Sequence, residues 1–342
     1  MNFMNTRVIV FGTGGKCEKW IQNLLEIDND TEIVCFVDNN KEKWNSLFRG
    51  KEVLPPEEVK KHENVTIVIA SSFYKEISKQ LSVEYGVDKG RIVTVEEYYR
   101  FRYTKKKYFE RYGQNLCEEP KKIKGKIAVY TANIGKYDTL LDPRYVDDSI
   151  DYYCYTDDKD YSSKVWKTIY LDENDKRDNA LRVRELKFFP EHFLPEYEYS
   201  IWVDSKFDIL GSLKEYAERY LKEQDLLLFP HFQRDCIYDE AVACIKCDKG
   251  NPIILGGQIY EYYNQGFPKH SGLYECGCIV RRHGSRKVQE IMQKWWDEIN
   301  RYSQRDQIAL PYIFWKENYN CDICDMDINR CEYLKVKVHN EK

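Results

Sequence analysis

The sequence lacks a long apolar run and an excess of basic residues. Its longest apolar runs, such as Val8–Gly12 and Thr66–Ala70, are far shorter than the ~20 residues that a membrane-spanning helix needs. Met1–Arg7 shows none of the three regions of a signal peptide. The 53 basic and 57 acidic residues leave a net charge of -4, without the cationic surface that nonspecific nucleic-acid binding requires. We therefore expect a cytoplasmic protein with no transmembrane segment and no nucleic-acid partner.

A disulfide framework is also lacking, because the 12 cysteines are scattered through a chain of 342 residues. We expect most of them to be reduced thiols. Structural zinc stays open as an alternative, although no cysteine set has a standard zinc-ribbon spacing. The sets considered are Cys244 and Cys247 with Cys276 and Cys278, and separately Cys321, Cys324 and Cys331 with His339.

The length of the chain exceeds what one hydrophobic core usually organises, so two domains are expected. Strand-like and helix-like runs alternate in residues 1–98, and strands separated by helices pair in parallel through right-handed crossovers. We predict a small Rossmann-like, doubly wound α/β domain there. The expected strands are Arg7–Phe11, Glu32–Val37, Val65–Ala70 and Arg91–Val95, and the expected helices are Lys16–Ile27, a stretch after Asp38, and Tyr74–Tyr85.

Residues 99–124 are basic, aromatic and polar, and we predict a connecting helix and linker there. The Lys105–Lys107 cluster and the lysines of 121–124 could instead contact an anionic membrane surface, where each basic residue contributes about 1 kcal/mol. Peripheral membrane contact therefore stays open as an alternative to a solvated linker.

The alternation restarts in residues 125–318, for which we predict a second α/β domain, followed by a polar tail over 319–342. A helix is expected over Asn179–Phe189, and the chain after the last strand is expected to be mainly helical to Lys316. The expected strands are Lys126–Thr131, Tyr152–Thr156, Lys167–Leu171, Tyr199–Val203 and Leu226–Pro230.

Aromatic residues make up 15% of the chain, and most lie beyond residue 95. Tyr and Trp stack on sugar and base faces while keeping a polar edge free, so this enrichment suits a carbohydrate or nucleotide site. An aromatic-rich core is the alternative.

A glycine turn follows the first strand. Gly12, Gly14 and Gly15 open a helix whose backbone N–H groups could hold a phosphate, and Asp38 stands where a ribose hydroxyl would be bound. The third glycine of the dinucleotide motif is replaced by Cys17, so a ligand-free docking module is an equal alternative. An NAD-dependent oxidoreductase is disfavoured because no Tyr-x-x-x-Lys pair occupies an interpretable position in this domain. The strand end at residues 36–40 resembles small Rossmann-like domains fused to bacterial glycan-modifying enzymes.

In the second domain, polar residues follow three strands. Thr131, Asn133 and Gly135 belong to a loop region at the end of the first strand, and Asp157 follows the second. Asp204 follows the buried strand at 199–203. Open α/β sheets bind ligands at the carboxyl ends of their strands, and a carboxylate there could reach a diphosphate through a divalent ion.

Seven ordered blocks of this domain resemble the glycosyltransferase-like family of the plant turgor-regulation and seed-mucilage proteins. The resemblance implies a GT-A type nucleotide-diphosphosugar transferase fold over nearly 190 residues. The blocks are Tyr130–Asp138, Arg182 with Lys187, Ser200–Lys206, His231–Arg234 with Tyr238–Ala241, Gln258 with Tyr262 and Gly266, Glu275 with Arg281 and His283, and Trp295 with Glu298, Arg301 and Arg305–Gln307.

The resemblance also suggests roles for individual residues. Asp204 is the expected contact to the metal or diphosphate, with Mn²⁺ or Mg²⁺ as the expected ion. Lys206 replaces the second acid of the usual Asp-x-Asp, and an ammonium could neutralise phosphate charge itself. Arg182 and Lys187 lie about 140° apart on one helix, so a solvated basic face is an equal alternative to donor binding.

The remaining candidates lie downstream. His231 and Glu240 are candidate catalytic residues, and with Arg234 they could instead form a structural charge network. Asp306 and Gln307 offer a carboxylate and an amide to sugar hydroxyls, with a helix cap as the alternative for Asp306.

The sequence thus predicts a glycosyltransferase that moves a sugar from a nucleotide-diphosphate donor to a hydroxyl on a glycan or lipid-linked acceptor. Bacterial surface polysaccharide or glycoconjugate assembly is the expected setting. A catalytically silent nucleotide-sugar-binding or scaffold protein is the alternative, because the Asp-x-Asp and glycine motifs are incomplete.

Overall fold

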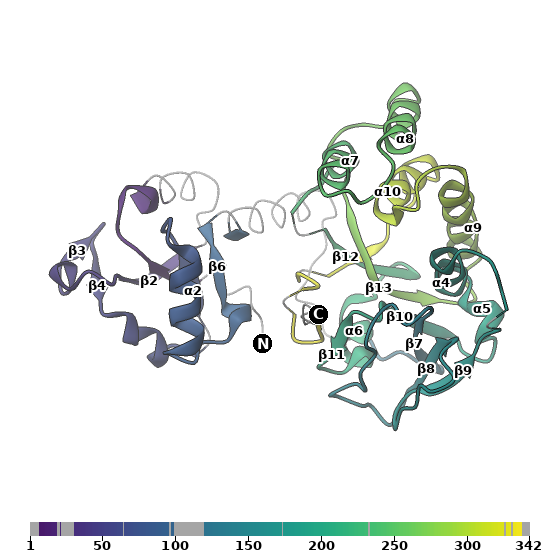
Figure 1. Ribbon diagram of the computed structural model, residues 1–342, viewed down its shortest axis with the longest axis horizontal. Helices are drawn as coiled ribbons and strands as arrows, with labels where there is room; N and C mark the ends of the chain where they lie inside the picture. Colours follow the sequence, from purple (N-terminus) through teal and green to yellow (C-terminus); the bar gives the residue numbers. More distant parts are fainter. Residues whose placement is uncertain are drawn as a thin grey trace. The chain divides into compact units, whose positions relative to one another are not determined.

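The protein forms two compact units, residues Met1–Gly113 and Gln114–Lys342, called here the N-terminal and C-terminal units (Figure 1). Their boundary falls inside the predicted connection at 99–124. Most of that connection, with the Lys105–Lys107 cluster and its possible membrane contact, lies outside the described residues. The computed structural model describes residues 7–18, 21, 31–63, 65–95, 97–98, 120–172, 174–231, 233–324, 326–329 and 331–336.

The N-terminal unit is built on a six-stranded sheet in the order β3-β4-β2-β1-β5-β6. Strand β1 lies in the middle and pairs in parallel with β2 and β5. Its apolar residues are buried, as expected for a parallel strand covered on both faces. Helix α2 (Tyr74–Val83) buries Ile77 and Leu81 against the sheet. The strands are β1 (Arg7–Phe11), β2 (Glu32–Val37), β3 (Leu47–Phe48), β4 (Lys51–Leu54), β5 (Thr66–Ile69) and β6 (Ile92–Thr94).

The prediction of a helix after Asp38 is wrong. Two short 3₁₀ turns, η1 (Lys41–Lys43) and η2 (Pro56–Lys61), flank an antiparallel β3–β4 hairpin instead. Arg49 and Gly50 at its tip both have positive φ, the backbone of a tight hairpin turn. A third 3₁₀ turn, η3 (Lys89–Arg91), precedes β6. Of the expected helix at 16–27, residues 15–18 and 21 are helical and the others lie outside the described residues.

The C-terminal unit contains a seven-stranded mixed sheet in the order β14-β12-β13-β10-β7-β8-β9. Its strands pair in parallel except β13, which runs antiparallel to both β10 and β12. The two parallel-rich sheets confirm the predicted α/β fold class and are consistent with a small Rossmann-like domain and a GT-A-like domain. The strands are β7 (Ile127–Asn133), β8 (Asp151–Thr156), β9 (Lys167–Tyr170), β10 (Tyr199–Val203), β12 (Leu226–Pro230), β13 (Tyr274–Arg282) and β14 (Asp322–Ile323).

The chain after β12 is mainly helical to Lys316, as predicted, but it also contains strand β13, which the sequence pattern did not predict. Figure 1 shows it in the middle of the sheet between β12 and β10. It is buried along nearly its whole length, so it lacks the alternation of apolar and polar residues that identifies a half-exposed strand.

Helices cover both faces of this sheet. Helix α6 packs Leu213, Tyr216 and Ala217 into the core on one face. On the other face, Phe188 at the end of α4 stacks on Trp295 of α9 with ring centroids 4.4 Å apart. The helices are α4 (Asn179–Phe188), α5 (Pro190–Phe193), α6 (Leu213–Tyr220), α7 (Ile237–Lys246), α8 (Pro252–Asn264), α9 (Arg286–Arg301) and α10 (Asp306–Lys316).

The predicted separate tail at 319–342 is wrong for the described part of that segment. Strand β14 joins the main sheet beside β12, and β15 (Leu334–Val336) pairs with β11 (Phe207–Ile209). Cys324 and Cys331 lie in the hydrophobic core. Residues 320–324 and 331–336 therefore complete the C-terminal unit.

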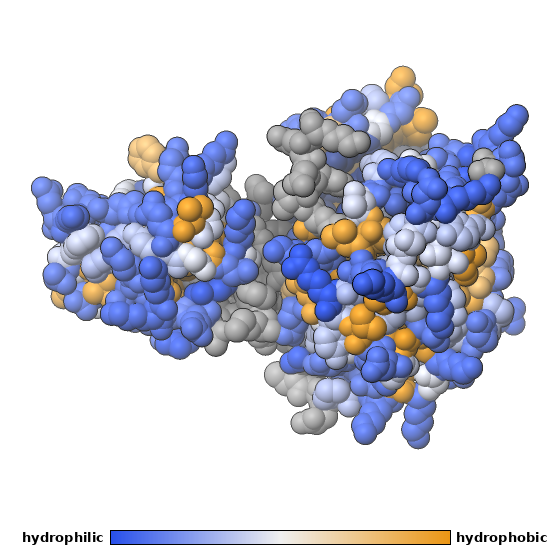
Figure 2. Space-filling model, turned by 60° about the horizontal axis from the view of Figure 1, so that its bottom comes forward, coloured by the Kyte–Doolittle hydropathy of each residue, from blue (hydrophilic) through white to orange (hydrophobic). Residues whose placement is uncertain are grey.

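Many of the aromatic side chains fill the core, which favours the structural alternative for their abundance. Trp202, Trp295, Tyr130, Tyr155 and Tyr216 are among the largest fully buried side chains. Figure 2 shows a face of the protein that is mainly hydrophilic, with separate hydrophobic patches on the larger unit. Within the described ranges, no helix has both the length and the apolar character needed to cross a bilayer.

Candidate functional site

The topology of the main sheet identifies one edge as the candidate site. From β7 the chain builds outward through β8 and β9, then returns to place β10 on the opposite side of β7. Open α/β sheets bind ligands at such a switch point, beyond the carboxyl ends of the strands. Here these ends carry the loop at 134–138 after β7 and Asp204 after β10.

Asp204 lies between two ammonium groups at this edge. Its Oδ1 accepts a 2.7 Å hydrogen bond from Trp202 Nε1 and lies 3.7 Å from Lys187 Nζ. Its Oδ2 lies 3.8 Å from Lys206 Nζ. The Asp204 side chain is 30% exposed, so it does not point into a closed hydrophobic interior. The Asp204 carboxylate and the Lys206 ammonium are therefore both accessible to a ligand at this edge.

Lys187 connects Asp204 to the start of α10. Its buried Nζ donates a 2.7 Å hydrogen bond to Asp306 Oδ2, while Arg184 Nη2 lies 3.9 Å from Asp306 Oδ1. Burial disfavours the charge on Lys187, but Asp306 and Asp204 outweigh it and raise its pKa. Burial likewise opposes ionisation of Asp306, yet Lys187 and Arg184 hold its pKa well below its usual range. Buried Lys187 and part-buried Asp306 thus form a fully charged pair.

The loop after β7 has a defined shape. Asn133 Nδ2 donates to Asp138 O at 2.7 Å, and Asp138 N donates back to Asn133 Oδ1 at 3.1 Å. Gly135 has φ +71°, and a Cβ there would lie 2.6 Å from Asn179 Nδ2, so glycine is required. Thr131 lies within β7, and its Oγ1 is buried without a hydrogen-bond partner among the described residues. These residues therefore shape the edge of the site.

Asp157 and Arg182 contact each other and do not both face a shared ligand-binding space. Asp157 Oδ1 accepts from Gly135 N at 2.8 Å, and its Oδ2 lies 3.8 Å from Arg182 Nη1. Buried Arg182 also pairs with Asp175 at 3.2 Å. Arg182 and Lys187 thus contact different carboxylates, and the two predicted donor-binding cations do not converge. A donor role for Asp157 and Arg182 stays a prediction.

A second charged cluster surrounds His231. Its Nε2 lies 3.7 Å from Glu240 and 3.5 Å from Glu275. Buried Glu240 accepts from Arg234 Nε at 2.5 Å, so its charge is already balanced. Gln307 Nε2 donates to Glu275 Oε2 at 2.9 Å. The structure thus brings these predicted residues into one cluster, in which His231 and Gln307 contact Glu275 and Arg234 contacts Glu240.

His231 is held as a neutral imidazole. Its Nδ1 accepts backbone hydrogen bonds from Gln233 N at 3.2 Å and Arg234 N at 3.1 Å, which places the proton on Nε2. Burial lowers the pKa of His231 to about 4, against the opposing effect of Glu240. The ring can therefore donate to a carboxylate but carries no charge near neutral pH.

Glu275 is the functional candidate to which our sequence reasoning assigned no role. Burial raises its pKa to about 7, and Asp327, Glu240 and Asp204 add to the rise while Lys206 opposes it. It lies near the start of β13, which runs beside the end of β10, where Asp204 N donates to Gly277 O at 2.8 Å. Its place in a matching sequence block was a signal, but burial and neighbouring charges are visible only in the fold.

The glycine turn of the N-terminal unit is hydrogen-bonded to residues of the same unit. Gly12 has φ +102°, and a Cβ there would lie 3.1 Å from Ala70 O. Asp38 Oδ2 accepts from Thr13 N at 3.0 Å and from Lys43 Nζ at 3.1 Å. A Cβ on Gly14 or Gly15 would meet nothing within 4 Å. Asp38 therefore holds the turn in place, and nucleotide binding there stays a prediction.

The ligand set at Asp204 does not fit a divalent cation well. One carboxylate is flanked by two ammonium groups, which supply positive charge where a metal would supply it. Among the described residues, Cys244, Cys247, Cys276 and Cys278 do not form a metal-binding group, nor do Cys321, Cys324 and Cys331, whose expected partner His339 lies outside the described residues. The only group there that could supply three ligands consists of Cys236, Asp239 and His270.

Comparisons with known proteins agree with the predicted resemblance. Residues 4–93 match the family described as C2185-like, N-terminal. Over 222 residues the chain is 23% identical to the probable hexosyltransferase MUCI70 of Arabidopsis thaliana, which covers 57% of this chain and 38% of that protein. The chain thus spans less than half the length of this curated relative. The resemblance to the plant mucilage-related family is confirmed.

Among solved structures, the chain is similar to the apo structure of the WbbM bifunctional glycosyltransferase. The similarity covers 58% of this chain and 38% of that one, at 12% identity and a TM-score of 0.36. At this score the likeness carries no argument about the fold or the site.

Proposed function

We propose that the C-terminal unit is a glycosyltransferase that moves a sugar from a nucleotide-diphosphate donor to a hydroxyl-bearing acceptor. The observation that carries the proposal is the placement of Asp204, Lys187 and Lys206 together at the switch point of the main sheet. The similarity to a probable hexosyltransferase supports it. A glycan or lipid-linked acceptor in bacterial surface polysaccharide assembly is the setting we propose, on the resemblance of the N-terminal strand end alone.

The two lysines suit the diphosphate of the donor. Partly exposed Lys206 can contact phosphate oxygens directly, and buried Lys187 adds a fixed positive charge behind Asp204. Preorganised charges aimed at the departing diphosphate stabilise the transition state without reorganising during the reaction. Asp306 and Gln307, at the start of α10, would bind the donor sugar.

Glu275 suits the acceptor better than the predicted Glu240. Glu240 is buried and paired with Arg234, whereas the Glu275 side chain is 19% exposed and has a pKa near neutrality. In the proposed step, Glu275 takes the proton of the acceptor hydroxyl while that oxygen bonds to the anomeric carbon. The bond from that carbon to the diphosphate breaks, and its electron pair leaves with the diphosphate. His231, whose Nε2 lies 3.5 Å from Glu275 Oε1, would orient Glu275.

The Asp204→Ala variant tests the proposal. We expect one class of nucleotide-diphosphate sugar to raise the melting temperature of the wild type and to be hydrolysed slowly or transferred. In Asp204→Ala the turnover should fall by about 10²–10³-fold, because Asp204 holds in place the Lys187 and Lys206 ammonium groups that stabilise the departing diphosphate. The measurements are a thermal-shift screen of UDP-, GDP- and dTDP-sugars, with a CMP-sugar as the single-phosphate control, followed by donor turnover.

The alternative of a silent binding protein gives a different result. Asp204 is already balanced by two lysines, an arrangement that also suits binding without turnover. Thermal stabilisation by a donor without hydrolysis or transfer to any acceptor would favour that alternative. No stabilisation by any donor would contradict both.

The metal expectation has its own test. Because Lys206 occupies the position of a second acid, we expect added Mn²⁺ or Mg²⁺ to change wild-type donor turnover by less than about twofold. Lys206→Asp would restore the second carboxylate, and its turnover should become dependent on Mn²⁺. A Mn²⁺ titration of both proteins measures this. A wild type that is inactive until Mn²⁺ is added would restore the expectation of a metal at Asp204.

A further inference from the structure

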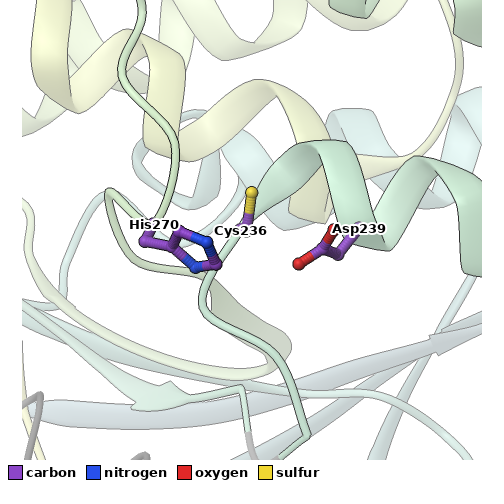
Figure 3. A group of neighbouring side chains, drawn as sticks. All are labelled: Cys236, Asp239 and His270. Atoms are coloured by element: carbon purple, nitrogen blue, oxygen red, sulfur yellow. The ribbon is translucent and has the colours of Figure 1, made fainter.

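A group of potential metal ligands lies outside the site described above. Cys236, Asp239 and His270 each offer one ligand atom, and these three atoms all lie within 4.8 Å of one another. Figure 3 shows Cys236 between the His270 ring and the Asp239 carboxylate. We propose that these three side chains bind a Zn²⁺-type ion that ties the start of α7 to the segment before β13.

The fold brings the three residues together from two distant segments. Cys236 is the N-cap residue of α7, and Asp239 lies three residues later in its first turn. His270 belongs to the connection between α8 and β13. The two segments are held in register by hydrogen bonds from Gly272 N to Asp235 O at 2.9 Å and from the Tyr238 hydroxyl to Phe267 O at 2.7 Å.

Cys236 supplies an independent sign of a ligand. Its side chain is only 2% exposed, and its Sγ has no hydrogen-bond partner among the described residues. A thiol that faces a histidine and a carboxylate is well suited to become a metal-bound thiolate.

His270 also has a carboxylate partner that would orient its ring for metal binding. Its Nδ1 lies 2.7 Å from Asp235 Oδ1. A carboxylate can only accept, so Nδ1 carries the proton and Nε2 carries the lone pair that a metal ion needs. Metal-binding histidines usually donate their other ring N–H to such a partner, which orients the ring and makes the ligand nitrogen more basic. We therefore assign Nε2 as the ligand atom and Asp235 as its positioning residue.

The ligand chemistry selects the class of ion. A thiolate, an imidazole and one carboxylate suit Zn²⁺, whereas Mg²⁺ and Ca²⁺ prefer oxygen ligands only. A tetrahedral zinc with ordinary bond lengths places its ligand atoms about 3.3–3.8 Å apart, so the ligand atoms, which lie within 4.8 Å of one another, would approach by about 1.5 Å at most. The thiolate and carboxylate would balance the charge of the ion, and the fourth position would hold water.

This ion would fix the positions of the two segments that carry His231 and Glu275. Cys236 follows the His231–Arg234 segment directly, and His270 precedes Glu275 by five residues. His231 N also donates to Leu273 O at 2.9 Å. A metal joining Cys236 to His270 would therefore brace both segments that carry the His231–Glu275 cluster, without contacting the reacting atoms.

Metal content and cobalt spectroscopy on the full chain test the proposal independently of activity. After incubation with Zn²⁺ and dialysis, we expect about one equivalent in the wild type and in Cys247→Ser, whose exposed cysteine lies at the end of the same helix. Cys236→Ser and His270→Ala should retain at least tenfold less zinc. Asp235→Asn should weaken zinc binding by about 10–100-fold, because the carboxylate that orients the His270 ring is lost.

Co²⁺ identifies the ligands directly. The wild type and Cys247→Ser should show thiolate-to-cobalt charge-transfer absorption, and Cys236→Ser should lose it. Because His270 is exposed, His270→Ala should fold even if the buried Cys236→Ser does not, and circular dichroism checks both. A wild type without stoichiometric zinc, or His270→Ala with wild-type zinc content, would overturn the proposal. Failure of donor turnover would leave these results unaffected.

Discussion

Replacing Lys187 by methionine is expected to lower the free energy of unfolding by about 3–5 kcal/mol. The buried Lys187 ammonium donates to Asp306 at 2.7 Å, so its loss leaves a carboxylate that is only 17% exposed without its closest cation. Arg184, 3.9 Å from Asp306, compensates in part. Urea denaturation followed by tryptophan fluorescence measures the change, because Trp202 and Trp295 are buried in the same unit.

Two further variants separate this effect from a general loss of packing. The double variant Lys187→Met with Asp306→Asn removes the uncompensated charge and should recover much of the stability. Lys206→Met is the matched control, because Lys206 is 43% exposed and its pair with Asp204 should contribute at most about 1 kcal/mol. An equal loss in Lys206→Met, or no recovery in the double variant, would show that the buried pair is not the cause.

Replacing Glu275 by glutamine is expected to lower the transfer rate by about 10²–10⁴-fold while donor binding changes little. This prediction depends on the proposed function. A general base works in its ionised form, and the ionised fraction of Glu275 increases as the pH rises through about 7. The wild-type rate should therefore rise between about pH 6 and 8, and this rise should vanish in Glu275→Gln. Steady-state rates over that pH range, with donor affinity from thermal shifts, provide the measurement.

Glu261→Gln is the control for this variant. Glu261 lies on α8 and bonds Gln265 at 2.8 Å, away from the His231 cluster, so its pH profile should match the wild type. Glu240→Gln should differ from both, because Glu240 is paired with Arg234 and its loss should reduce stability more than it changes the pH profile. A pH profile that persists in Glu275→Gln and disappears in Glu240→Gln would return the role of base to Glu240.

The charged groups of the site form two clusters with different properties. Lys187 and Asp306 keep their charges because they pair at 2.7 Å, which raises the pKa of Lys187 and lowers that of Asp306. The pKa of Glu275 is raised to about 7 because burial and neighbouring carboxylates oppose its ionisation. Fixed charge suits a diphosphate, and a carboxyl group that titrates near neutral pH suits proton transfer.

Local sequence pattern was sufficient to predict the bounds of the strands whose apolar runs have clear ends. Strands β1, β2, β10 and β12 have the predicted bounds, and Asp204 follows β10 because a charged residue ends that buried run. Local pattern failed for β13, whose burial on both faces removes any alternation. It failed also for the segment after residue 319, whose short strands have meaning only as partners of β12 and β11.

The pairing and ionisation of the site residues depend on contacts between distant parts of the chain. Lys187 meets Asp306 across 119 positions, and Arg182 meets Asp157 from the next helix, so no local spacing could assign their partners. The pKa of Glu275 depends on burial and on charges from three other segments, and the Cys236–His270 group depends on a loop that returns after α8. Periodicity is a property of neighbours along the chain, whereas desolvation and Coulomb interactions act between neighbours in space.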